Sequence, residues 1–217
     1  EIAALASQNG LRHAAGIARL VIAESSLERQ STNEARQHLS QAKEHLHDID
    51  DAVAQAESQL IEARLLAANN QLGEAIEQLA AIQNVDLGLS VHLRCSFWRA
   101  RFETTRDPSS AIHAICDAKQ AAQTFGNQEI LWQVLALECR RAARLESPDL
   151  NDVRRNAMRV IDAWRSRLNP EYAQSYFATA SRRELLSWIR PPMPASIAAS
   201  GVQVSGAALK RMVGINR

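Results

Sequence analysis

The sequence predicts an all-α protein made of stacked helical hairpins, and three observations favour this fold class. Strong helix formers, chiefly alanine, leucine, glutamine and arginine, dominate the 217 residues, which include only 8 Gly and 6 Pro. Apolar side chains recur at spacings of four and three residues, as they do on one face of a helix. This apolar triplet itself recurs every 36 to 42 residues, a period typical of helix pairs that stack.

The apolar triplets mark the second helix of each predicted pair. They are Ala35, Leu39 and Ala42; Ala75, Leu79 and Ile82; Ala111, Ile115 and Ala118; and Val153, Ala157 and Val160. The preceding helix has a small residue 11 to 14 positions upstream of each triplet: Ala23, Ala63, Ala100 and Cys139. We expect these small side chains to let the two helices of a hairpin approach closely.

Helix start and stop signals place the elements in order. Residues 2–7 resemble the end of an earlier helix, which Asn9-Gly10 terminates. Ser31 offers an N-cap, and Pro108 suits a first helical turn. The predicted helices are Leu11–Arg29, one after Ser31 with the first triplet, Ala52–Asn69, Glu74–Ile82, one ending near Thr105, one from Asp107 to Phe125, Ile130–Leu145, and one after Ser147 with the fourth triplet.

The C-terminal end differs from this repeating pattern. Residues 169–190 predict a capping helix with an apolar side for the last repeat and Arg182 and Arg183 on the polar side. Prolines at 191 and 192 end this helix, and residues 191–217 predict a flexible tail containing Pro, Gly and Ser, with a short helical turn near 207–213. The predicted division is therefore 1–168 for the repeats, 169–190 for the cap and 191–217 for the tail.

The segment from Ala63 to Ile82 resembles a tetratricopeptide (TPR) repeat: a small residue, a turn, then alanine, a large residue and a further apolar residue at spacings of four and three. The resemblance covers about residues 11–168. The long period of the pattern is similar to that of the degenerate repeats found in large bacterial signalling ATPases, kinases and transcriptional activators. The pattern lacks the Trp-Tyr pair and the closing proline of the TPR family. The match to the capping helix of those bacterial proteins rests on Leu168, Pro170, Glu171, Phe177, Arg183, Leu185 and Leu186.

This resemblance implies a right-handed α-solenoid of about four TPR-like hairpins whose first helices line a concave groove. It also implies a non-catalytic scaffold or a regulatory sensor domain that binds a protein, a peptide or a covalently linked sister domain. Because the chain begins at Glu1 within a helical pattern, we expect it to be part of a larger bacterial signalling protein. The alternative is the scaffold portion of a multidomain enzyme, such as an ATPase, kinase or caspase-like protease, whose catalytic domain lies elsewhere.

Polar residues of the first helices are the candidates for contacting a partner, because the family's first helices face the groove. Arginines further along the chain, from Arg140 to Arg167, would form a basic surface on two antiparallel helices. Such a surface is either a solvated helix face or a contact for an acidic protein, and both are favoured over nucleic acid. The candidate residues are Arg64, Asn69, Arg94, Arg101, Arg140, Arg154 and Arg155.

Charge is unevenly distributed along the chain. Residues 1–90 contain 6 Lys and Arg against 13 Asp and Glu, a net charge of −7, and residues 91–217 contain 19 against 11, a net charge of +8. This polarity would steer a charged partner or domain, although two separately solvated faces would also produce it. A faint helix-turn-helix pattern at residues 197–212 lacks a supporting helix upstream.

A metal-dependent hydrolase is the lesser alternative. His47-Asp48 resembles the metal-binding pair of the all-helical HD phosphohydrolases, with His13 and Asp117 as further potential ligands. The surrounding segment, however, fits the apolar stripe of the repeat. The sequence has no H-E-x-x-H, phosphate-loop or G-x-S-x-G motif, so we expect no catalytic residues, metal or cofactor.

Cysteine use and hydropathy bear on localisation. Cys95, Cys116 and Cys139 are odd in number and lie near apolar stripes, which predicts buried free thiols in a reducing cytoplasm. No apolar run is long enough to cross a membrane, so we expect no membrane contact.

Overall fold

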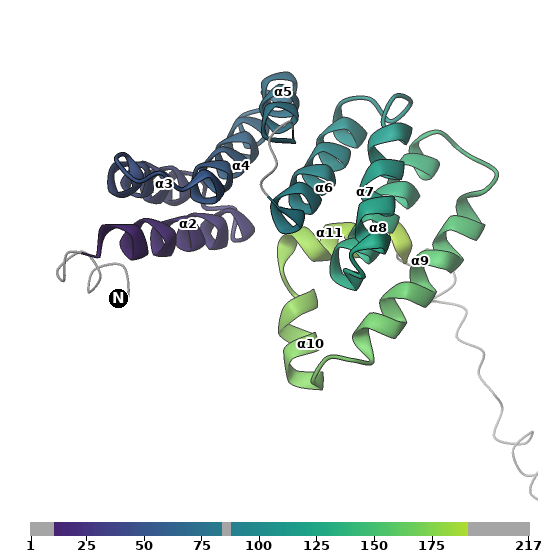
Figure 1. Cartoon of the computed structure of the whole chain (residues 1–217). Coiled ribbons are helices and arrows are strands. Elements are labelled where there is room, and N and C mark those ends of the chain that lie inside the picture. The colour runs from purple at the N-terminus through teal and green to yellow at the C-terminus, as the bar shows by residue number, and fades with distance from the viewer. Residues whose placement is uncertain (1–10, 84–87, 191–217) are drawn as a thin grey trace, which may run out of the picture.

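A computed structural model describes residues 11–83 and 88–190. Within these ranges all regular secondary structure is α-helical, with ten helices and no strand (Figure 1). The predicted all-α class is therefore confirmed. The helices are α2 Arg12–Glu28, α3 Thr32–Leu46, α4 Ala52–Ala68, α5 Leu72–Gln83, α6 Leu89–Arg106, α7 Ile112–Thr124, α8 Gln128–Arg144, α9 Leu150–Arg165, α10 Pro170–Phe177 and α11 Ala180–Ile189.

From α2 to α9, each helix packs against its neighbours in the sequence. In addition, α2 packs against α4, α4 against α6, and α6 against α8. These four are the predicted first helices of the hairpins, so one side of each first helix contacts the next. Figure 1 shows α2–α5 in one part of the molecule and α6–α11 in the other. The two parts meet where α6 packs against α4 and α5.

The predicted apolar stripes form the core. Every member of the first three triplets is buried, with at most 5% of its surface exposed. In the fourth triplet only Ala157 is fully buried, and Val153 and Val160 pack at the edge of the core. The small residues predicted in the first helices are all completely buried: Ala23, Ala63, Ala100 and Cys139.

Close approach is most marked between α2 and α3. Gly16 of α2 is buried against Leu46 of α3, and a Cβ added to it would lie only 2.6 Å from Leu46 Cγ. Any larger residue at position 16 would therefore push the helices apart. The close packing of α2 on α3 therefore depends on the absence of a side chain at Gly16. The other first helices also have small buried residues, as expected for helices that approach closely.

Three hairpins share one turn geometry. The residue two positions beyond each first helix has a positive φ: 64° at Gln30, 66° at Asn70 and 50° at Glu146. The next residue donates its N–H to a carbonyl five positions earlier, from Ser31 to Ser26, Gln71 to Leu66, and Ser147 to Ala142. This is the helix-ending motif in which glycine is usual. The same turn thus follows α2, α4 and α8.

The predicted single capping helix at 169–190 is wrong in one respect, because the segment forms two helices. Pro170 begins α10, with Asn169 accepting a hydrogen bond from Glu171 N. The chain then breaks at Ala178-Thr179, where Thr179 is extended. Tyr176 of α10 donates its hydroxyl to Glu129 of α8 at 2.8 Å, and beyond the break α11 packs on α8 and α9.

Some predictions lie outside the described residues. These are the helix end at 2–7, the turn at 84–87, the tail at 191–217 and the helix-turn-helix pattern within it. Among the residues that are described, no helix combines the length and the apolar character needed to cross a membrane.

Candidate functional site

A chain of ion pairs crosses the side of the molecule formed by the first helices. Arg64 of α4 donates hydrogen bonds to Glu24 and Glu28 of α2, at 3.0 and 2.8 Å. Arg94 of α6 reaches the same Oε1 of Glu24 at 2.6 Å and also Glu57 of α4 at 2.5 Å. Glu24 is therefore shared between two arginines, and three helices are joined by these contacts. We call this set of residues the charge chain.

Trp98 of α6 lies at the centre of the charge chain. The guanidinium groups of Arg64 and Arg101 lie 4.1 and 5.1 Å from the centroid of its ring, close enough for cation–π attraction. The half-buried ring also packs against the core clusters on both sides of α6. Trp98 therefore connects the N-terminal and C-terminal parts of the protein as well as the two arginines.

Helix α11 extends the charge chain at its C-terminal end. Arg101 donates to Ser181 Oγ at 2.9 Å and to Glu184 at 2.8 Å, and Arg140 of α8 approaches the other oxygen of Glu184 at 3.4 Å. The C-terminal helix thus lies on the same side of the molecule as the first helices. It covers part of that side at α6 and α8.

The two most buried arginines of the charge chain are Arg64 and Arg140, whose side chains are 5% and 9% exposed. The carboxylates that they contact, Glu24 and Glu184, are 37% and 43% exposed. Burial lowers the pKa of Arg64, although Glu28 and Glu24 oppose that change. These two arginines therefore hold the helices together, and Glu24 and Glu184 remain accessible to a partner.

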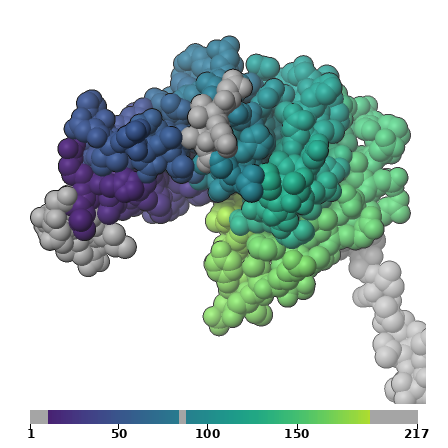
Figure 2. All heavy atoms as spheres, in the orientation of Figure 1, coloured from purple at the N-terminus to yellow at the C-terminus, as the bar shows by residue number. Residues whose placement is uncertain are grey.

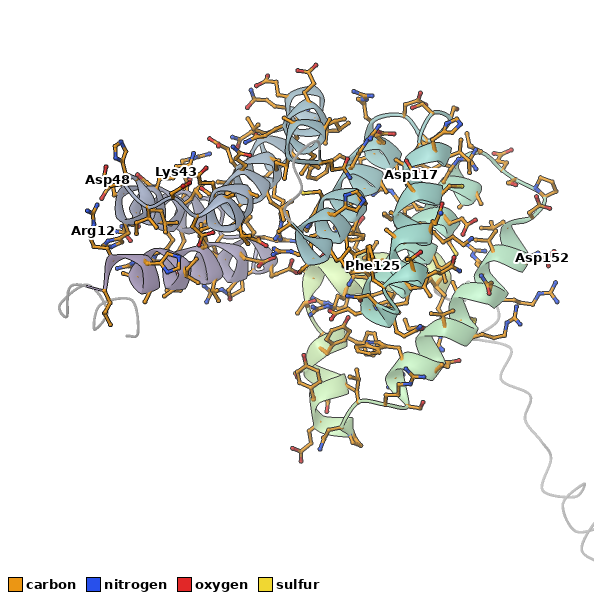
Figure 3. All side chains as sticks on the ribbon, viewed as in Figure 1. Arg12, Lys43, Asp48, Asp117, Phe125 and Asp152 are labelled. Carbon is orange, nitrogen blue, oxygen red and sulfur yellow. The ribbon has the colours of Figure 1, made fainter. Side chains whose placement is uncertain are left out.

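Two open cavities flank Trp98, each with a volume of about 520 Å³. One lies between α2, α6 and α8, where Glu28, Leu89 and Phe125 contribute to its wall. The other lies between α2, α4, α6 and α11 and includes Ser181. Figure 2 shows the surface hollowed between α2 and the C-terminal helices, and Figure 3 labels Phe125 at this boundary. Volumes of this size are typical of ligand sites.

The structure brings together four of the seven predicted site residues. Arg64, Arg94, Arg101 and Arg140 all belong to the charge chain, but each is already paired with a carboxylate of this protein. Contact of these four arginines with a partner stays a prediction. Their observed contacts are with neighbouring helices.

The other three predicted site residues lie elsewhere. Asn69 is the exposed C-cap of α4, where its backbone N–H closes the helix. Arg154 of α9 donates to the carbonyl of Trp188 at 3.1 Å and so fixes the end of α11. Arg155 pairs with Asp152 on the same exposed turn. Within the arginine-rich run, Arg154 thus makes a structural contact, and Arg155 lies on a solvated helix face.

Sequence reasoning missed the carboxylates and the tryptophan. Glu24, Glu28 and Glu57 lie on first helices, but only the packing of α2, α4 and α6 shows that they face the arginines. The available signal was that Trp98 lies within the same first-helix pattern, four residues after Arg94 and three before Arg101. Ring and guanidinium groups at this spacing share one face of a helix.

The residues considered for a metal site are not brought together. His47 Nδ1 lies 2.7 Å from Asp48 on the exposed end of α3, where Arg12 also approaches that aspartate. His13 pairs with Asp51 instead, at 2.7 Å. Figure 3 shows Asp117 on α7, in the other part of the molecule from Asp48. Across residues 11–83 and 88–190, no group of three His, Cys, Asp or Glu side chains is arranged to hold a metal ion.

The cysteines divide into two kinds. Cys95 and Cys139 are buried, and burial raises their thiol pKa values to about 11 and about 12. The prediction that all three are buried is wrong for Cys116, which is exposed on α7 because it points away from the stripe formed by Ile115 and Ala118. All three thiols are free.

Comparison with known proteins identifies no relative. No protein-family model, no curated protein and no solved structure matches this chain.

Proposed function

We propose that this protein is a non-catalytic scaffold or regulatory domain that binds a protein segment, or a covalently linked sister domain, on the side formed by its first helices. The observation that carries the proposal is the hollow around Trp98, where two cavities of about 520 Å³ adjoin a chain of ion pairs contributed by four first helices and α11. A rigid, mixed polar and aromatic surface of this kind suits peptide recognition.

A right-handed α-solenoid of TPR-like hairpins is the architecture we propose for this function. The buried triplets, the small residues of the first helices, and the turn repeated after α2, α4 and α8 support a repeating unit. The contacts of α2 with α4, of α4 with α6 and of α6 with α8 support successive stacking of first helices. In such a solenoid the first helices, which contribute most of the charge chain, would line the concave side.

The charge chain would act by organising the surface before a partner arrives. Because Arg64 and Arg94 hold Glu24 from two directions, the carboxylate loses little freedom when a ligand binds. Exposed apolar surface next to it, at Leu89, would supply the contact area. Basic or amide groups of a peptide would meet Glu28 and Glu129, and its apolar side chains would meet Leu89 and Phe125.

The test is a selection from a displayed peptide library against this protein, followed by affinity measurements on variants. Leu89→Glu changes a 64% exposed residue in the wall of the first cavity and should weaken binding about tenfold or more. The matched control is Val53→Glu, at a 48% exposed position on α4 outside both cavities. Equal effects of the two changes, or a selection that enriches no peptide, would reject the proposal.

A further inference from the structure

A third cavity lies at the C-terminal end of the protein, between α9, α10 and α11, with a volume of about 600 Å³. Its wall is mainly apolar, and none of its residues belongs to the two cavities around Trp98. We call it the α9–α11 pocket. The three helices that line it make few direct contacts with one another. Helix α11 packs mainly on α8, and α10 is separated from α11 by the break at Ala178-Thr179.

The interior of the α9–α11 pocket comes from all three helices. Ile161 of α9 and Ala173 of α10 are almost completely buried, 3% and 5% exposed, and form its floor. Phe177 of α10 and Leu186 of α11 are half-buried and form its walls. An apolar cavity of this volume lies within the range occupied by small ligands.

The rim of the α9–α11 pocket is basic. Three exposed arginines contribute to it: Arg165 of α9, and Arg183 and Arg190 of α11. The only acidic residue in the wall, Asp162, is already paired with Arg190 at 2.6 Å. The rim therefore has a formal charge of +2, because two arginines remain without a carboxylate from the pocket.

The two unneutralised arginines are available to an anion. Arg165 has a cation–π contact with Phe177, with its guanidinium carbon 5.9 Å from the ring centroid. Within the described residues, the guanidinium of Arg183 has neither a hydrogen bond nor an ion pair. The backbone N–H of Arg183 donates to Thr179 O at 2.9 Å in the first turn of α11. Both groups can turn toward an acid at the mouth of the pocket without breaking an ion pair.

We propose that the α9–α11 pocket binds a single-chain anionic amphiphile, with its hydrocarbon chain against Ile161, Phe177 and Leu186 and its acid group between Arg165 and Arg183. Charge complementarity selects an acid, because an exposed guanidinium stabilises a carboxylate better than it does a neutral or cationic group. A volume of about 600 Å³ accommodates one hydrocarbon chain, whereas an amphipathic helix binds along an extended groove. Burying the apolar wall supplies the driving force.

Calorimetric titration of the full chain tests this directly, with dodecanoate as the probe at concentrations below its micelle threshold. Dodecanol and dodecyltrimethylammonium are the neutral and cationic comparators with the same chain length. We expect saturable binding of dodecanoate, with affinity about tenfold or more above that of the cationic compound. Absence of binding, binding only above the micelle threshold, or equal binding of all three probes would overturn the proposal.

Two variants locate the site. Arg183→Ala should raise the dissociation constant for dodecanoate about fivefold, a value reduced for the solvent exposure of this residue. Ala178→Phe, at an exposed position in the pocket wall, should block entry of the chain. Arg144→Ala, which removes an exposed arginine of α8 outside the pocket, is the matched control and should change nothing.

These outcomes are independent of peptide binding at the charge chain. If dodecanoate binds and Ala178→Phe does not weaken it, the amphiphile occupies another site and the assignment of the pocket is wrong. If an acidic peptide binds at this end of the protein but dodecanoate does not, the pocket is part of a protein interface and the amphiphile proposal fails. Circular dichroism of each variant establishes that the fold is retained.

Discussion

The two parts of the molecule are packed by different means. All ten aromatic residues of the chain lie after residue 96. The core of α2, α3 and the adjoining side of α4 consists only of alanine, leucine and isoleucine, whereas the core of α6–α11 includes Phe97, Trp132 and Tyr176. The N-terminal helices therefore pack by close approach, which Gly16 permits, and the C-terminal helices pack around large rings.

This difference has an energetic consequence at the boundary. Small side chains bury less apolar area per residue than aromatic ones, so the N-terminal part gains less from the hydrophobic effect. The charge chain joins this part to α6 through Arg64, Arg94 and Trp98. We therefore expect α2–α5 to be the less stable part and to depend on these contacts for its position.

The largest expected effect is that of Trp132→Ala in the aromatic core. Trp132 is completely buried, packs against Tyr176 and Phe177, and donates its indole N–H to Tyr176 Oη at 3.2 Å. Its truncation should lower the free energy of unfolding by about 3–5 kcal/mol. Urea denaturation followed by circular dichroism measures this change.

Trp132→Phe separates the loss of ring volume from the loss of the hydrogen bond. It retains most of the ring and should cost about 1–2 kcal/mol, for one lost hydrogen bond and a smaller void. Equal losses for Trp132→Ala and Trp132→Phe would show that ring packing does not stabilise the C-terminal part in the way proposed. The remaining tryptophans, Trp98, Trp164 and Trp188, lie on α6, α9 and α11, so their fluorescence reports on the C-terminal part and on its boundary with α4, whereas circular dichroism reports on the helices of both parts. A fluorescence curve that does not coincide with circular dichroism would show that the two parts unfold separately.

Arg64→Met tests the ion pairs that Arg64 of α4 makes with α2, together with its cation–π contact with Trp98 at the boundary. The change leaves Glu24 and Glu28 without their buried partner, but both carboxylates are about one-third exposed and can be solvated. We therefore expect a loss of about 2 kcal/mol, below the 3–5 kcal/mol typical of fully buried pairs. Arg29→Met, which removes a pair with Glu34 whose arginine is 60% exposed, should cost under about 0.5 kcal/mol. If the two variants lose the same stability, the buried contacts of Arg64 stabilise the protein no more than an exposed ion pair does.

The stripes and the charge chain differ in how far sequence could predict them. The buried triplets depend only on spacing within one helix, so Ala35, Leu39 and Ala42 could be identified without coordinates. The charge chain depends on which side chains of separate helices meet. Glu24 and Arg94 are 70 residues apart, and no local pattern relates them. Four of the predicted site residues lie in the charge chain, but their carboxylate partners could be identified only from the packing of the helices, and partner binding at these positions stays a prediction.

The helix ends show a second limit of local patterns. Glycine is the usual residue with positive φ after a helix, and Gly126 follows that rule with a φ of 65°. Gln30 and Glu146 adopt the same conformation without glycine, so the usual glycine signal does not mark these turns. Residues 169–190 read alone likewise indicate one helix, whereas the structure has a break between α10 and α11, next to the hydrogen bond from Tyr176 to α8.

A smaller effect is expected at matching helix starts in the two parts. Asp51 caps α4 by accepting from Ala54 N at 2.9 Å, and Asn127 caps α8 by accepting from Ile130 N at the same distance. Replacing either with alanine should cost about 1 kcal/mol at neutral pH. Urea midpoints for both variants, measured under identical conditions, provide the comparison.

Only the Asp51 cap should depend on pH. The hydrogen bond from Ala54 N and the contact with His13 lower the pKa of Asp51 in the folded protein. A carboxylate with a lowered pKa stabilises the fold above its unfolded pKa, near 3.9, and loses that contribution as the pH falls through the lower folded value. Asp51→Ala should therefore approach the parent protein in stability as the pH falls below the unfolded pKa of about 3.9, while the cost of Asn127→Ala stays constant. A constant cost for both variants would contradict this account.

The smallest expected effect is a gain in stability at the repeated turn. Glycine adopts positive φ without the steric cost that Gln30 and Glu146 pay, but it also has more freedom in the unfolded chain. The net gain for Gln30→Gly or Glu146→Gly should be about 0.5–1 kcal/mol in each case. Because the turn is the same after α2 and α8, global unfolding should show similar gains for both variants. A gain seen by circular dichroism but not by tryptophan fluorescence for Gln30→Gly would instead show that α2–α5 unfolds before the aromatic part.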